Sequence, residues 1–195
     1  MTFSPSDGVT SIAPEEQGDL FPDLSNQQEL NEWERENILI AVRWALDSRS
    51  FSLRDPLDES YVRELHRRMF DQTWKWAGMY RATEKNIGVA PHQIREELAK
   101  LLADVRYWMS NKSYAIDEIG ARLHHKLVSI HPFPNGNGRH SRLMTDVVLK
   151  HRGVAPFTWG SADLMASGDV RERYIAALRA ADAGDLTPLL AFVRT

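Results

Sequence analysis

Residues 131–142 read HPFPNGNGRHSR and bring a histidine, a glycine-containing turn and two arginines into one short stretch. Gly136 and Gly138 lack a Cβ, so the backbone can adopt positive φ and direct successive N–H groups at one anion. The residues that follow favour a helix over about 138–151, and the N-terminal end of a helix dipole also attracts an anion. The stretch therefore predicts a phosphate-binding loop that opens a helix.

The charged side chains of this stretch predict chemistry on a phosphate. Arg139 and Arg142 are three residues apart and share a helix face, where guanidinium groups can clamp phosphate oxygens. His131 has an ordinary pKa near 6.5, which suits proton removal at neutral pH. We expect His131 to deprotonate a hydroxyl that attacks a bound phosphate. The alternatives are that the arginines form surface ion pairs and that His131 before Pro132 only ends a helix.

The stretch resembles the signature of the Fic (filamentation induced by cyclic AMP) family, HxFx(D/E)GNGRxxR, and differs from it at one position. Two other segments are similar to the family: WKWAGMYR at Trp74–Arg81, and YIAALRAADAGDLTPLLAF at Tyr174–Phe192. The resemblance covers residues 57–194, and within the family it is greatest to the subgroup called mobile mystery protein B. It implies an all-α, mainly helical Fic fold with a small β-hairpin flap.

The resemblance also implies an activity, namely transfer of AMP from ATP to a Ser, Thr or Tyr hydroxyl of a target protein, which includes the chain itself as a target. In this assignment His131 is the base, Arg139 holds the β-phosphate region and Arg142 holds the γ-phosphate. Phe133 packs into the core to fix the loop. The remaining nucleotide-binding residues are Gly136, Asn137 and Gly138, which line the anion hole with help from the Asn137 amide, and Tyr174, which lies near the adenine and ribose.

Asn135 is the one departure from the signature, because the family carries Asp or Glu there to bind magnesium. A neutral amide oxygen can coordinate a hard cation but lacks the charge attraction. We expect ATP with Mg²⁺ or Mn²⁺, with weaker use of the metal. Two alternatives stay open: a different nucleotide or transferred group, and a site that binds nucleotide with poor turnover.

Residues 83–94, TEKNIGVAPHQI, are punctuated by Asn86, Gly88 and Pro91 and predict a short hairpin. The segment resembles the Fic flap, which holds the target by strand-like main-chain pairing. An ordinary surface loop is the alternative. The predicted target-binding residues are Asn86, Ile87, Gly88 and Val89.

The sequence offers two candidate residues for regulation by an inhibitory glutamate. Many Fic enzymes carry an inhibitory helix with (S/T)xxxE(G/N), whose Glu pairs with the second motif arginine. Glu36 precedes Asn37 but has Glu32 at the Ser/Thr position, and Glu29 has Ser25 at the right spacing but is followed by Leu30. Glu36 and Glu29 are thus candidate inhibitory residues. Alternatively they are exposed acids on a solvated helix face, and a separate antitoxin or regulatory protein supplies the glutamate.

Composition fits an intracellular enzyme. The chain has 195 residues, no cysteine and a net charge of −3, which suits one domain in a reducing compartment and gives no reason to expect nucleic-acid binding. The start lacks a signal-peptide pattern, and no run approaches the roughly 18 apolar residues of a membrane span, so we expect a cytoplasmic protein without membrane partners. Two other classes stay open: a Doc-like protein kinase, and a non-catalytic nucleotide-binding module.

The chain divides into an irregular or docked arm at 1–25, a helix and connector at 26–56, and a Fic domain at 57–195. Ser25 is the predicted cap of the first helix, whose inner face carries Leu30, Trp33, Ile38, Ala41, Trp44 and Ala45. Further helices are predicted after Asp58, after Pro91, and over residues 115–130, 138–151, 162–167, 169–182 and 187–194.

Overall fold

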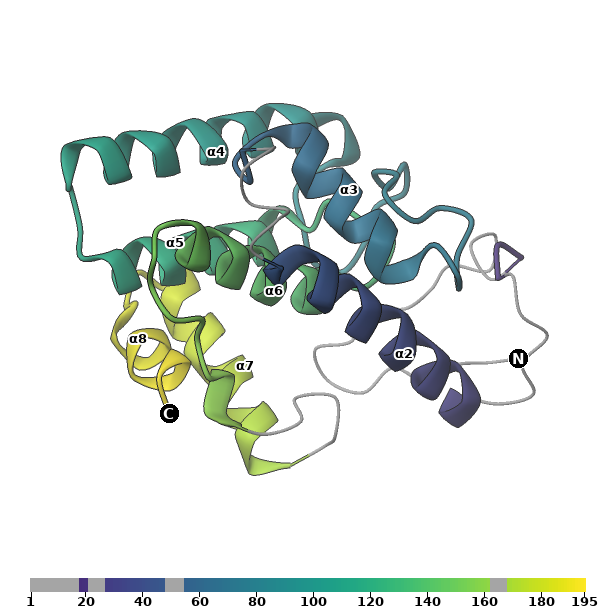
Figure 1. The fold of residues 1–195 in the computed structure, drawn as a ribbon. Coiled ribbons are helices and arrows are strands. Elements are labelled where there is room, and N and C mark those ends of the chain that lie inside the picture. The colour runs from purple at the N-terminus through teal and green to yellow at the C-terminus, as the bar shows by residue number, and fades with distance from the viewer. Residues whose placement is uncertain (1–17, 21–26, 48–54, 162–167) are drawn as a thin grey trace.

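The computed structural model describes residues 18–20, 27–47, 55–161 and 168–195. Within these ranges the chain is mainly helical, as predicted (Figure 1). The helices are α2 (Gln27–Leu46), α3 (Glu59–Phe70), α4 (Ile94–Asn111), α5 (Ile116–Ile130), α6 (Asn137–His151), α7 (Asp169–Asp182) and α8 (Thr187–Val193), with 3₁₀ turns η1 (Pro91–Gln93) and η2 (Trp159–Ser161). The predicted helix at 162–167 and the Ser25 cap lie outside the described residues.

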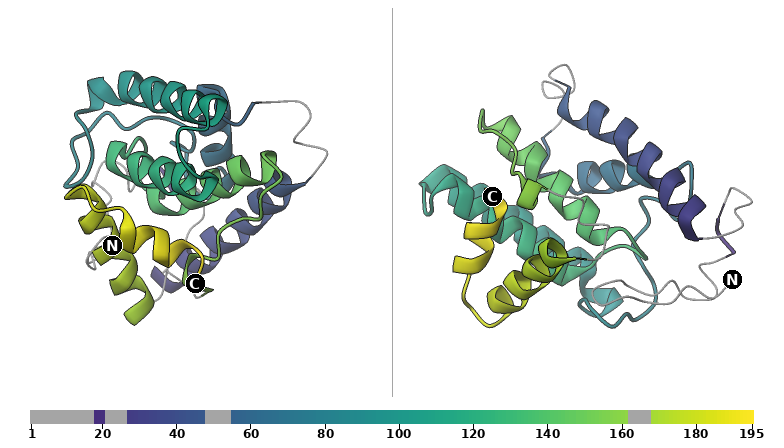
Figure 2. Two further views of the ribbon diagram at one scale, coloured as in Figure 1. Left: turned by 90° about the vertical axis from the view of Figure 1, so that its left-hand side faces the viewer. Right: turned by 90° about the horizontal axis from the view of Figure 1, so that it is seen from below.

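Helices α5 and α6 pack against each other at the centre of the molecule (Figures 1 and 2). Helix α4 packs on α5, helices α2 and α3 pack together and contact α6, and α8 packs on α5 beside α7. The 131–136 loop joins the two central helices. The phosphate-binding stretch therefore lies where elements from both ends of the chain meet.

Two hydrophobic clusters fill the spaces around α5 and α6. One is built from α2 to α6 and contains the fully buried Phe133, as the resemblance implied. The other is built around α7, α8 and η2 and contains Tyr174 and Phe192. Because Phe133 anchors the loop between α5 and α6 in the first cluster, the loop backbone can be held in an unusual conformation.

The inner face of α2 is largely as predicted. Leu30, Ala41 and Ala45 are buried, whereas Trp33 is 44% exposed and donates its Nε1–H to the Gln72 carbonyl at 3.0 Å. Tryptophan suits such an edge, because its ring can pack while its N–H finds a polar partner. Before this helix, Leu20 forms a single bridge with Trp74, so this part of the predicted arm is docked on the body.

The predicted β-hairpin flap is wrong in its secondary structure, because residues 83–90 form bends without a strand. The Arg81 guanidinium donates NH1 to Thr83 O at 2.9 Å and NH2 to Val89 O. In a hairpin, backbone N–H groups of the opposite strand would donate to such carbonyls. The Val89 N–H donates at 3.3 Å to the carbonyl of Ile130, the last residue of α5. The two ends of residues 83–89 are therefore held together by the Arg81 side chain rather than by backbone hydrogen bonds between strands.

None of the helices in the described parts of the chain is both long enough and apolar enough to cross a membrane.

Candidate active site

His131 ends α5 in the left-handed conformation, with φ 54° and ψ 59°. This conformation costs a residue other than glycine roughly 1–2 kcal/mol, so other contacts must hold it. The His131 N–H donates to Leu127 O at 3.2 Å, and the Arg81 Nε–H donates to His131 O at 2.7 Å. The chain therefore turns sharply at the predicted base and is fastened on both sides of the turn.

The His131 ring is buried and poised as a base. Its Nδ1 lies 3.3 Å from Val128 O, and only a protonated Nδ1 can donate there, so the basic lone pair belongs to Nε2. Burial, aided by the positive charges of Arg81 and Lys85, lowers the pKa of His131 to about 4. The ring is therefore neutral at pH 7 and can accept a proton.

The turn after His131 needs glycine at Gly136. This residue has φ 76°, and an added Cβ would lie 2.4 Å from the Phe70 ring. The Asn137 side chain closes the same turn, accepting from Phe133 N–H at 2.9 Å and donating to Phe133 O at 2.8 Å. The amide that we expected to face the ligand is thus engaged by the loop, which leaves Asn137 to act through its main chain.

The first turn of α6 carries the predicted anion-binding donors. The first intrahelical bond is donated by His140 N to Gly136 O at 2.9 Å, so the N–H groups of Asn137, Gly138 and Arg139 precede it. These groups point out of the positive end of a four-turn helix, which is a general site for phosphate. The fold therefore gives the predicted phosphate loop a suitable backbone geometry, and phosphate binding there stays a prediction.

The two motif arginines contact different neighbours. Arg139 NH1 lies 2.5 Å from Glu34 Oε2 on α2, and its guanidinium lies 4.9 Å from the centre of the Phe70 ring. The Arg142 guanidinium lies 5.5 Å from the centre of the Tyr174 ring on α7. Their spacing in the sequence predicted one shared face, but the tertiary contacts turn one guanidinium toward α2 and the other toward α7.

Glu34 is the acid of α2 that reaches the motif. It is 5% exposed, and its Oε1 accepts the Trp74 Nε1–H at 2.7 Å. Glu36 and Glu29 are exposed on the same helix, so their inhibitory role stays a prediction. A sequence signal for Glu34 existed, because it follows Leu30 by four residues and precedes Ala41 by seven, which places it on the buried face.

Two further residues support the loop. His66 is fully buried; its Nδ1 accepts Gly78 N–H at 3.0 Å, so its Nε2 donates to Asn135 O at 3.0 Å. Burial lowers the pKa of His66 well below its ordinary value, and the ring stacks on Phe133 at 3.7 Å between centroids. A single histidine on an apolar helix face gives no indication in the sequence that its ring will connect two backbone groups.

Arg81 is the second such residue. It is 3% exposed and, besides its contacts to Thr83, Val89 and His131, its N–H donates to Pro132 O at 3.0 Å. Gly88 permits this packing, because an added Cβ would lie 2.5 Å from Arg81 NH2 and 2.8 Å from His131 Cβ. Arg81 ends the WKWAGMYR segment, so the family resemblance already carried a signal for it.

We predict that Arg81→Lys slows the transfer proposed below by about 10–100-fold. A lysine ammonium lacks the planar guanidinium that donates to several carbonyls at once. The variant therefore loses hydrogen bonds that connect the His131 turn to residues 83–89. Nucleotide affinity should change less than 3-fold, because the anion-binding donors lie on α6. Transfer rates and equilibrium binding of an ATP analogue measure the two effects.

The control for this variant is Arg194→Lys, because Arg194 also donates to two carbonyls, Ala155 O and Pro156 O, away from the motif. Equal losses in both variants, or a loss of nucleotide affinity that matches the loss of rate, would contradict a specific role for Arg81.

The structure offers little for a resident metal. Among the described residues no group of three or more His, Asp or Glu side chains could hold an ion. The Asn135 Oδ1 accepts Gly136 N–H at 2.5 Å and is a single neutral oxygen. Such a donor fits a cation whose other ligands are phosphate oxygens and water, as is usual for magnesium at nucleotide sites.

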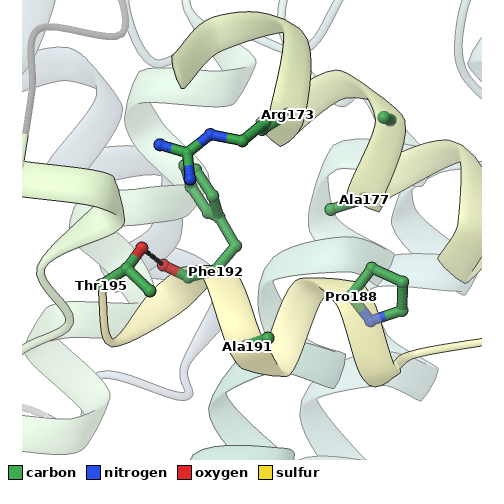
Figure 3. Close-up of a pocket in the computed structure, with 7 residues that line it drawn as sticks. Arg173, Ala177, Pro188, Ala191, Phe192 and Thr195 are labelled. Atoms are coloured by element: carbon green, nitrogen blue, oxygen red, sulfur yellow. Dashed lines mark hydrogen bonds between the residues drawn. The ribbon is translucent and has the colours of Figure 1, made fainter. Parts of the chain in front are cut away.

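A separate hollow of about 390 Å³ lies between α7 and α8 (Figure 3). Small apolar side chains line most of it, and Arg173 is its charged residue. None of its lining residues belongs to the motif, so this hollow is not where we place the phosphates. The lining residues are Arg173, Ala176, Ala177, Pro188, Ala191, Phe192 and Thr195.

A neutral histidine lies beside a helix N-terminus that carries two arginines, which is a geometry that can bind an anion and accept a proton next to it. Residues 56–149 match the Fic/DOC family, and the chain belongs to this family. The closer resemblance to mobile mystery protein B stays a prediction.

The sequence similarity to known proteins extends over most of this chain. Protein adenylyltransferase fic-1 of Caenorhabditis briggsae is 34% identical over 140 residues, which cover 68% of this chain and 25% of the relative. The chain thus spans about a quarter of the curated relative it matches. Fic-1 (residues 134–508) of C. elegans superposes with a TM-score of 0.64 at 26% identity, covering 92% of this chain and 52% of that one.

A further solved structure is evidence for the fold only. The BepC protein of Bartonella tribocorum, solved with bound AMPPNP, superposes with a TM-score of 0.66 at 19% identity and covers 93% of this chain and 97% of that one.

Proposed function

We propose that this chain is a protein adenylyltransferase that moves AMP from ATP to a hydroxyl group of a target protein. The observation that carries the proposal is the neutral, buried His131 held in a left-handed turn directly before the anion-binding start of α6. The adenylyltransferase names of the relatives support the same activity. The relatives are longer than this chain, so the target and partners are proposed from this domain alone.

In the proposed step, the target hydroxyl oxygen attacks the α-phosphorus of ATP and its proton passes to His131 Nε2. A new O–P bond forms, the bond from the α-phosphorus to the bridging oxygen breaks, and pyrophosphate leaves. The N–H groups of Asn137, Gly138 and Arg139 stabilise charge on the phosphoryl oxygens, which is the main source of rate enhancement in such transfers. The Gly136 N–H donates to Asn135 Oδ1 and is not one of these donors. Arg139 and Arg142 hold the β- and γ-phosphates.

Magnesium or manganese would enter with the triphosphate and take one ligand from Asn135. The metal would neutralise phosphate charge, while the residues of this chain orient the nucleotide and accept the proton. An ATP-consuming reaction needs a compartment rich in ATP, and we place it in the cytoplasm.

The target is proposed to lie along residues 86–89, where Gly88 lies next to His131 and Val89 donates its N–H to Ile130 O. Arg81 joins Thr83 and Val89, on either side of this segment, to the His131 turn, so a hydroxyl carried by a bound peptide would be delivered to the ring. Main-chain recognition reads backbone shape rather than a particular sequence. A separate antitoxin or regulatory protein stays a prediction.

The test is to incubate the pure protein with α-³²P ATP or γ-³²P ATP, with Mg²⁺ or Mn²⁺ and a host lysate. We expect label on protein from the α-position alone. Label from the γ-position alone would replace the proposal with a protein kinase. Nucleotide binding without transferred label under every metal condition would replace it with a non-catalytic binding module.

A further inference from the structure

Tyr174 on α7 places a buried hydroxyl group beside the phosphate-binding turn of α6. The residue is 5% exposed, which leaves little ring surface for a nucleotide base. A Cβ added to Gly138 would lie 4.0 Å from the Tyr174 hydroxyl oxygen and 3.9 Å from Arg142 NH1. The hydroxyl and the guanidinium therefore reach the same point at the start of α6.

The Tyr174 hydroxyl has a partner on each side. Its oxygen lies 3.0 Å from His124 Nε2, and the Arg142 guanidinium lies 5.5 Å from the centre of its ring. Burial raises the pKa of Tyr174, and the charge and hydrogen bond of Arg142 oppose this rise. The opposition arises because a guanidinium N–H donates to the phenolic oxygen and stabilises negative charge there.

His124 is held so that it can accept from Tyr174. Burial lowers the pKa of His124 to about 3, so the ring is neutral and one of its two nitrogens can accept a hydrogen bond. Because a guanidinium N–H of Arg142 donates to the phenolic oxygen, the Tyr174 O–H is the donor to His124 Nε2 at 3.0 Å. The Trp159 ring packs 4.6 Å from the His124 ring between centroids, which limits its rotation.

We propose that Tyr174 and His124 are positioning residues that orient Arg142 toward the terminal phosphate, and that they thereby set the preference for a nucleoside triphosphate over a monophosphate. The proposal rests on the function above, in which Arg142 holds the γ-phosphate. A guanidinium oriented before binding loses less side-chain entropy when phosphate arrives. Tyr174 thus contributes to nucleotide binding through Arg142 rather than through contact with adenine.

Tyr174→Phe tests this, because it removes the hydroxyl and keeps the ring under Arg142. We expect affinity for AMPPNP to fall about 10-fold and affinity for AMP to change less than 2-fold, measured by calorimetry. In an Arg142→Ala background, Tyr174→Phe should cause no further loss. Equal losses for both nucleotides, an unchanged affinity for AMPPNP, or additive losses in the double variant would overturn the proposal.

Tyr114→Phe is the matched control, because Arg122 lies 4.2 Å from the centre of the Tyr114 ring, far from the motif in the sequence. It should leave both affinities unchanged.

A second measurement needs no nucleotide. In ¹⁵N–¹H NMR spectra the Arg142 Nε–H signal, assigned through Arg142→Ala, should be sharp in the wild type and broadened in Tyr174→Phe. An unchanged signal would overturn the positioning role. If the wild type bound neither nucleotide, the proposed function would fail while this signal still decided whether Tyr174 orients Arg142.

Discussion

Replacing His131 with alanine is expected to lower the rate of AMP transfer by about 10²–10⁴-fold, the range that a positioned general base contributes. Binding of AMPPNP should stay within about 3-fold of wild type, because the anion-binding N–H groups belong to α6. Initial rates with α-labelled ATP and equilibrium binding measure the two effects. His92→Ala, which changes an exposed histidine on η1, should alter neither.

The same histidine predicts an unusual pH profile. With a pKa of about 4, His131 is unprotonated over the range in which an ordinary histidine titrates. The value of kcat/KM should therefore stay level from pH 8 to about pH 5 and decline only as the pH falls toward 4. An acid limb centred near pH 6.5 would contradict the buried environment that the fold gives this ring.

Acid also weakens the fold, so each rate needs a check of folding. Burial lowers the pKa of His124 to about 3 and that of His140 to about 4, so the unfolded chain binds more protons below pH 6.5. Stability therefore falls as the pH drops, by up to about 1.4 kcal/mol per pH unit for each histidine. Burial raises the pKa of Asp146 to about 6, which offsets part of this loss. Circular dichroism at each pH separates unfolding from protonation of His131.

Replacing Glu34 with glutamine is expected to raise the affinity for ATP about 10-fold or more. The buried carboxylate holds Arg139 and places a negative charge where the β-phosphate should bind, with little water to screen it. A tenfold gain corresponds to about 1.4 kcal/mol, which is modest for a charge pair at this distance. Glutamine keeps an oxygen that can accept the Trp74 Nε1–H, so the packing of α2 should persist.

Glu36→Gln and Glu29→Gln are the matched controls, because both acids are exposed on the same helix. If Glu36 or Glu29 were the inhibitory residue, its substitution rather than that of Glu34 would raise ATP affinity and transfer. If Glu34→Gln instead weakened ATP binding, Glu34 would be a support that orients Arg139, and inhibition by a separate protein would gain weight.

Much of the site follows from local sequence. The glycines, the histidine and the arginines of residues 131–142 are close along the chain, so their spacing alone predicts a turn, a helix N-terminus and a base beside it. Apolar periodicity likewise predicts α4 and α5 to within a few residues. Such features depend on backbone geometry within one or two turns, which short sequence patterns encode directly.

The pairings between distant segments were harder to predict. The sequence pattern predicts a hairpin for the flap, but hydrogen bonds from the Arg81 guanidinium replace the pairing between strands. Hydrophobic periodicity does not indicate which groups one buried arginine will contact. Glu36 and Glu29 were selected from a motif, whereas Glu34 faces the site because of the rotation of α2 on α3 and α6. A short motif does not specify how one helix is rotated against another.

The sequence by itself determined the mainly helical fold and predicted an anion-binding loop with a base beside it, because each depends on residues adjacent in the chain. Only the tertiary structure decided that Arg139 meets Glu34, that Tyr174 meets both Arg142 and His124, and that burial lowers the pKa of His131. These outcomes depend on which side chains from α2, α5 and α7 fill the space around the start of α6. Packing, charge and loss of water act there together, across segments that are far apart in the sequence.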